Sequence, residues 1–153
     1  MRPFVGRVGI AFVAFLLVGV AASDASAQVR PFMFKSEGVV ALDGSGCSVQ
    51  VGQATHFGEF RAEGCLPVVG PFINGVAPVV GSETTTAANG DMVFGDAVGT
   101  LDINSVPWVA DGTITVVGGT GRFAGASGST SFHDLINPAD GSFVGSGSGT
   151  ISY

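Results

Sequence analysis

Two cysteines, Cys47 and Cys65, are the side chains whose spacing bears most directly on chemistry. They form no C-x-x-C pair and have no cluster of histidines beside them, so the spacing of a redox or zinc site is missing. In an oxidising compartment such a pair usually forms a disulfide. We therefore predict a structural Cys47–Cys65 bridge, which chain-entropy reasoning values at about 3 kcal/mol of stability. Free or intermolecular thiols remain the alternatives.

The chain has two imidazoles, His56 and His133. In an extended strand, residues one or three apart point to opposite faces, so neither His56 with Glu59 nor His133 with Asp134 forms a local pair. No G-x-S-x-G or H-E-x-x-H motif is present. Tertiary contacts could still join either histidine to an acid, although a solvated or core-edge histidine is the commoner outcome. The sequence therefore assigns no catalytic, metal-ligating or cofactor-binding residue.

Residues 119–124 match the dinucleotide-binding pattern G-x-G-x-x-G/A and follow the apolar segment 113–117. That motif needs a helix whose N-terminus binds the pyrophosphate. Residues 125–130, Gly-Ala-Ser-Gly-Ser-Thr, are mostly poor helix formers, so we predict a structural turn between strands instead. Arg122 in this turn could face a carboxylate ligand, but a surface or hydrogen-bonded turn arginine is the commoner case.

The elements that would position these residues are strands. Glycine, valine, threonine, serine and phenylalanine dominate beyond residue 28, and no apolar helical periodicity is sustained there. Turn signals such as Asn89-Gly90 separate the extended runs. The expected strands are residues 32–42, 48–62, 76–86, 92–103, 113–117, 129–136 and 142–153. Seven or eight strands of this spacing predict an all-β barrel or sandwich.

The final strand predicts how its two faces divide. Every second residue from Phe143 is aromatic, aliphatic or glycine, whereas the alternate positions from Val144 mostly carry hydroxyl groups. We expect the hydroxyl face to meet water. The glycines on the other face predict either close approach of neighbouring side chains in a packed barrel or space for a small apolar ligand.

Residues 1–27 are typical of a cleaved signal peptide. Two arginines precede an apolar run at residues 8–22, and Ala25-Ser26-Ala27 forms a small-x-small cleavage site. The run is too short for a membrane span, which needs about 18 apolar residues. We predict export to the periplasm or the extracellular medium, with a mature chain that starts at Gln28, spans residues 28–153 as one domain and does not insert into a membrane.

The charge of the predicted mature chain disfavours several partners. The first 27 residues hold two of the six basic residues and one of the twelve acids, so residues 28–153 carry a net charge of −7. Such a chain repels phosphate backbones, which argues against nucleic-acid binding and adhesion to anionic membranes. The sequence does not specify an oligomeric state.

The stretch GGTGRFAGASG at residues 118–128, together with residues 54–60 and 88–91, resembles exported bacterial proteins of the allene oxide cyclase and dirigent β-barrel superfamily. The resemblance implies an eight-stranded antiparallel barrel with two strands after the glycine-rich segment and an interior that can host a small apolar molecule. In that superfamily the plant cyclase isomerises a fatty-acid epoxide, and dirigent proteins orient phenoxy radicals during coupling. None of those families' catalytic carboxylates or tyrosines is matched to a residue here.

The sequence favours a non-catalytic module that binds a small apolar ligand or serves as a structural component, with no cofactor. An interior filled solidly by phenylalanine and valine would exclude the ligand. The alternative is an isomerase or radical-coupling guide, and it requires an interior carboxylate or histidine beside an open cavity.

Overall fold

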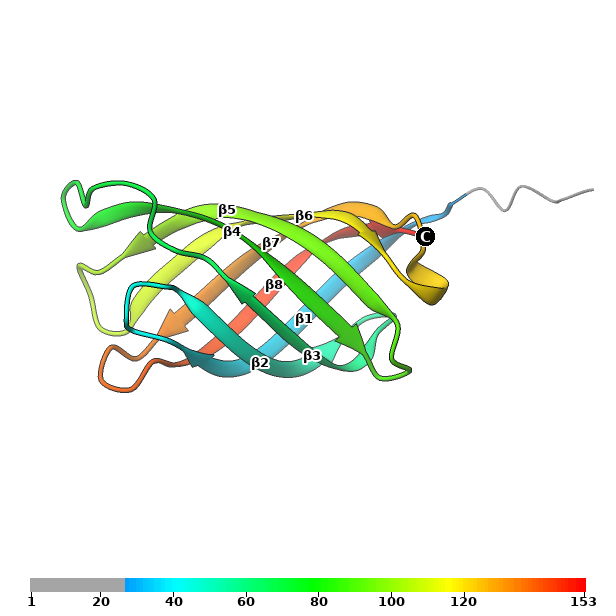
Figure 1. The fold of residues 1–153 in the computed structure, drawn as a ribbon, viewed down its shortest axis with the longest axis horizontal. Coiled ribbons are helices and arrows are strands. Elements are labelled where there is room, and N and C mark those ends of the chain that lie inside the picture. Colours follow the sequence, from blue (N-terminus) through cyan, green and yellow to red (C-terminus); the bar gives the residue numbers. More distant parts are fainter. Residues whose placement is uncertain (1–26) are drawn as a thin grey trace, which may run out of the picture.

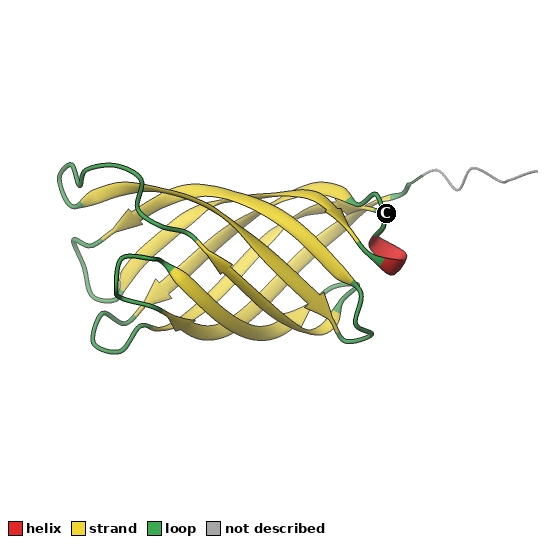
Figure 2. Ribbon diagram, in the orientation of Figure 1, coloured by secondary structure: helices red, strands yellow, loops and turns green. Residues whose placement is uncertain are grey.

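The computed structural model describes residues 27–153, so nearly all of the predicted signal peptide lies outside the described residues. Eight antiparallel strands close into one barrel, in which each strand pairs with its sequence neighbours and the last pairs with the first (Figures 1 and 2). The predicted all-β barrel is therefore confirmed. The strands are β1 (Val29–Val40), β2 (Cys47–Ala54), β3 (Gly58–Cys65), β4 (Val76–Ala87), β5 (Met92–Asp102), β6 (Trp108–Gly119), β7 (Ser127–Ile136) and β8 (Ser142–Ser152).

One expected strand was wrong, because residues 48–62 form two strands joined by a tight turn. His56 takes a φ of 70°, an uncommon value for a residue with a side chain. The turn is held by a bond from the Phe57 amide to the Ala54 carbonyl, and the Phe57 side chain is buried. Gly58, which directly follows the turn, also has a φ of 70°, so one local signal was present, and burial of Phe57 adds a tertiary contact that stabilises the turn.

Alternate residues of each strand face the interior, as the period of two requires. On β8 the inward positions are Phe143, the glycines and Ile151, while Ser148 and Thr150 are exposed, which confirms the predicted hydroxyl face. Gly147 explains part of the glycine pattern. A Cβ at this position would overlap the Phe34 ring and the Ser131 carbonyl oxygen, so glycine allows both groups to approach the strand closely.

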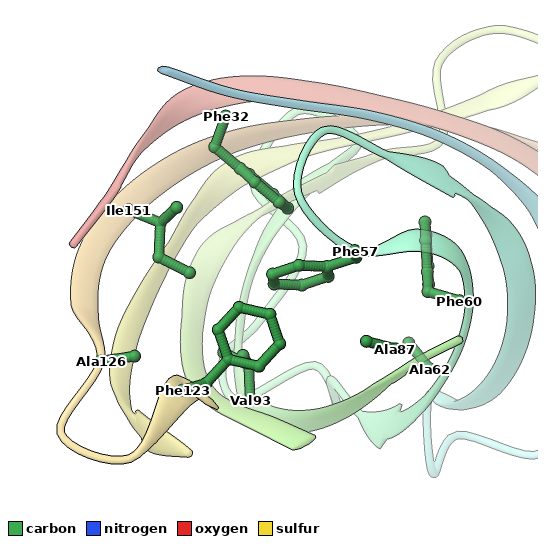
Figure 3. Close-up of a cluster of buried hydrophobic side chains, with 9 residues drawn as sticks. All are labelled: Phe32, Phe57, Phe60, Ala62, Ala87, Val93, Phe123, Ala126 and Ile151. Atoms are coloured by element: carbon green, nitrogen blue, oxygen red, sulfur yellow. The ribbon is translucent and has the colours of Figure 1, made fainter. Parts of the chain in front are cut away.

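Aromatic side chains close the barrel end that carries the C-terminus (Figures 1 and 3). The Phe57 ring packs against Phe32 at 4.9 Å and against Phe123 at 4.7 Å between ring centroids, and Tyr153 packs on Phe123 at 4.9 Å. Phe123 belongs to η1 (Gly121–Phe123), a single 3₁₀ turn, and is fully buried. The glycine-rich segment is thus the predicted structural turn, and it delivers a core side chain. We call this the closed end.

The predicted disulfide joins Cys47 and Cys65, which are cross-strand partners on β2 and β3. A disulfide indicates an oxidising, exported environment. The bridge ties the two strands beside the loops 41–46 and 66–75 at the other end of the barrel, which we call the open end. Within residues 27–153, no helix has the length and apolar character needed to cross a membrane.

Candidate ligand-binding cavity

The open end of the barrel contains a cavity of about 390 Å³. Its walls are mainly apolar and include five aromatic side chains, Phe34, Phe72, Trp108, Phe132 and Phe143. An engineered apolar cavity of about 150 Å³ binds benzene, so this volume suits a ligand of roughly two or three rings. The interior is therefore not solidly packed. A broader hollow on the outer wall along β1, β2 and β8 lies open to solvent and encloses nothing.

Loops position the entrance of this cavity. Val68 and Phe72, from the loop at residues 66–75, line it together with Leu42 from the loop at residues 41–46. The Leu66 amide donates to the Gly46 carbonyl at 3.0 Å, directly beside the disulfide. The bridge and this bond hold the two loops together. Toward the closed end the interior narrows to a void of about 40 Å³ above Phe32 and Phe57.

Two acids project into the cavity, Glu83 from β4 and Asp134 from β7. Asp134 faces inward because it alternates with the buried Phe132 and Ile136 along its strand. The Thr85 hydroxyl, one inward position beyond Glu83, lies 3.4 Å from the Glu83 Oε1 atom. Since β4 and β7 are not adjacent, the two carboxyl groups enter the cavity from different parts of its wall.

The interior perturbs the titration of both acids. Burial raises the pKa of Glu83, and the hydrogen bond from Thr85 opposes this effect. Burial and then the negative charge of Glu83 raise the pKa of Asp134 to about 7. His133 lowers the pKa of Asp134 and Asp111 raises it, both by smaller amounts. Asp134 can therefore gain or lose a proton near neutral pH, as a general acid or base must.

A serine hydroxyl lies near Asp134. Ser36 is buried, and its Oγ atom has no hydrogen-bond partner. A Cβ added to Gly145 would stand 2.8 Å from the Ser36 Oγ atom and in contact with Oδ1 of Asp134. The Ser36 hydroxyl and the Asp134 carboxyl thus approach Gly145 from the two neighbouring strands, and only glycine fits between them.

The residues that the sequence singled out lie elsewhere. His133 is on the outer wall, where its Nδ1 atom is 2.6 Å from Oδ1 of Asp111. His56 lies at the closed end with its Nε2 atom 3.0 Å from the Pro31 carbonyl oxygen. Arg122 donates from Nη2 to the His56 carbonyl at 2.5 Å, which confirms a hydrogen-bonded turn arginine. None of these side chains lines the open-end cavity.

The sequence reasoning did not find Glu83 and Asp134 as site residues. A signal for Asp134 was present, because it lies two positions from both Phe132 and Ile136 and so shares their face. For Glu83 the flanking inward residues, Gly81 and Thr85, carry no such apolar signal. The alternative function required an interior carboxylate beside an open cavity, and the structure contains two.

No family model and no curated protein matches the sequence. Among solved structures, the barrel is similar to a pterocarpan synthase dirigent protein, with a TM-score of 0.50 and 16% sequence identity. The match covers 84% of this chain and 87% of the other. The protein therefore has a dirigent-like β-barrel fold, and an identity this low establishes the fold alone.

Proposed function

We propose that this dirigent-like barrel binds a small, largely apolar ligand in the open-end cavity. The observation that carries the proposal is the cavity itself, about 390 Å³ with apolar walls and two carboxyl groups. Ligand sites typically combine a volume of about 300–1,000 Å³ with apolar walls and a few placed polar groups. A ligand body of two or three rings would contact the aromatic walls, and Glu83 and Asp134 would bind its polar group.

The proposed location of this activity is outside the cytoplasm. The disulfide supports an exported environment, and the predicted signal peptide at residues 1–27 supplies the route. The mature chain would begin at Gln28 and act in the periplasm or the extracellular medium. The intact mass of protein recovered from a secreting host tests the cleavage site, and a retained N-terminus would contradict it.

Uptake of a neutral solvatochromic dye, Nile red, tests the binding function. We expect its emission to shift to the blue and saturate with the mature protein. Ala110→Phe places a ring inside the cavity and should abolish uptake, because Ala110 faces inward among the lining residues. Val98→Phe is the matched control, since it adds the same ring on the outer face of β5. Equal dye uptake by both variants would contradict binding in the cavity.

A second candidate function is proton-transfer catalysis, as in an isomerase or coupling guide. Asp134 favours this function because its pKa is about 7, and a general acid or base is most effective when its pKa is close to the working pH. The test is hydrogen exchange at the carbon next to the carbonyl of 2-tetralone in D₂O, followed by NMR. We expect the protein to accelerate deuterium uptake and Asp134→Asn to remove most of the acceleration. Exchange at the uncatalysed rate would count against this function.

A further inference from the structure

We propose that the cavity's natural ligand is a cation, a protonated amine on an apolar or aromatic body, held by Glu83 and Asp134. This inference rests on the proposed binding function and adds the chemical class of the ligand. It starts from the distribution of charge inside the barrel. The cavity lining contains these two acids and no lysine, arginine or histidine.

The basic side chains of the described chain are placed away from the cavity. Arg30 stacks on the Tyr153 ring at the closed end, with 5.0 Å between its Cζ atom and the ring centroid. Lys35 and Arg61 are exposed on the outer wall. Enclosed carboxylates are costly unless a counter-charge or hydrogen bonds offset the loss of water. A cationic ligand would supply the counter-charge that the lining residues do not.

The entrance carries the same sign of charge. Its four loops, residues 41–46, 66–75, 103–107 and 137–141, contain Asp43 and Asp140 and no basic residue. Hydrogen bonds from Ser45 and Ser142, respectively, lower the pKa of these two acids, so both are ionised at neutral pH. An acidic entrance above an acidic interior attracts cations and repels anions.

The polar geometry matches an ammonium group. Such a group has three N–H donors, and the carboxyl groups of Glu83 and Asp134 line the cavity as acceptors, together with Ser48 and Gln50, whose side chains also carry acceptor oxygens. The aromatic walls add faces on which a cation is favoured over a neutral group of equal size.

The ionisation of the acids makes binding of an amine depend on pH. The charged neighbours of Asp134 are Glu83 in the interior and Asp111 and His133 on the outer wall. Because its pKa is about 7, Asp134 loses its proton as the pH rises to 8. An ammonium ligand favours the ionised carboxylate, so its affinity should increase from pH 6 to pH 8. A neutral ligand that accepts a hydrogen bond from the protonated carboxyl should show the opposite trend.

A matched set of probes tests the charge of the ligand. Three naphthalenes that carry an aminomethyl, a hydroxymethyl or a carboxylate group are compared by calorimetry on the mature protein at pH 8. We expect the amine to bind at least about tenfold more tightly than the alcohol and the carboxylate to show no binding. Asp134→Asn and Glu83→Gln should each remove most of the amine's advantage. Asp96→Asn, an exposed acid on the outer face of β5, is the control that should retain it.

The outcomes separate the two proposals. If the alcohol binds as tightly as the amine, the cation assignment is overturned and the cavity remains a binding site. If Nile red binds but none of the three probes does, the cation assignment is likewise overturned. If neither the probes nor Nile red bind, the proposed function itself fails. Circular dichroism of each variant establishes that a loss of binding does not come from unfolding.

Discussion

Replacing Asp134 by asparagine should make the protein more stable at alkaline pH, although the change removes a native side chain. The pKa of Asp134 is raised from 3.8 to about 7 in the folded barrel, chiefly by burial. Between these values the folded chain holds a proton that the unfolded chain has lost. The free energy of unfolding therefore decreases as the pH rises from about 4 to 7, and it levels off above the folded-state pKa.

The magnitude follows from the size of the shift. Each pKa unit corresponds to about 1.36 kcal/mol, so a shift of roughly three units costs the wild-type protein up to about 4 kcal/mol at pH 8. This is an upper limit, because the carboxyl group borders a cavity that water can enter. Asparagine has nearly the same shape and no charge, and it avoids the cost at every pH.

Urea denaturation of wild-type and Asp134→Asn proteins at pH 4, 5.5 and 8 measures the effect. The stability of the variant relative to wild type should rise by about 2–4 kcal/mol from pH 4 to pH 8. Taking the difference removes the contributions of other acids, such as Asp43 and Asp140, whose pKa values are lowered in both proteins. Asp96→Asn on the outer wall should show no comparable rise. A difference that stays constant with pH, or that falls, would refute the burial argument.

Three further substitutions test the packing. Replacing Cys47 and Cys65 together by serine should lower the free energy of unfolding by about 3 kcal/mol in a denaturant titration, and reduction of the wild-type protein should cause the same loss. An unchanged free energy of unfolding would contradict a stabilising bridge. Gly145→Ala places a methyl group against two interior oxygens and should cost about 1–3 kcal/mol and weaken Nile red uptake; unchanged stability and uptake would mean that the space beside Gly145 is open. Phe123→Ala should cost about 3–5 kcal/mol in thermal unfolding because the ring is fully buried at the closed end, whereas the outward-facing Phe94→Ala should cost much less. Equal losses would contradict the packing role of Phe123 at the closed end.

The sequence by itself determined the elements that depend on local rules. Alternation along residues 143–152 predicted which face of the last strand meets water, because the side-chain period of a strand is two whatever it packs against. Turn residues such as Asn89-Gly90 marked strand ends through their own backbone preferences. The disulfide followed from the predicted export and from the presence of two cysteines. The strand count allowed a barrel or a sandwich, and the family resemblance of the glycine-rich segment indicated the barrel.

Only the tertiary structure decided the features that depend on closure of the barrel. The turn at His56 is held by burial of Phe57 at the closed end, a contact that no local pattern encodes. Glu83 and Asp134 come from nonadjacent strands 51 positions apart in the chain, and they share one cavity because β8 pairs back onto β1. Alternation states that two residues face the same way, but whether that direction is a packed core, a cavity or solvent is set by where the other strands lie. For this reason the acids that we propose as the ligand site became visible only in the closed barrel.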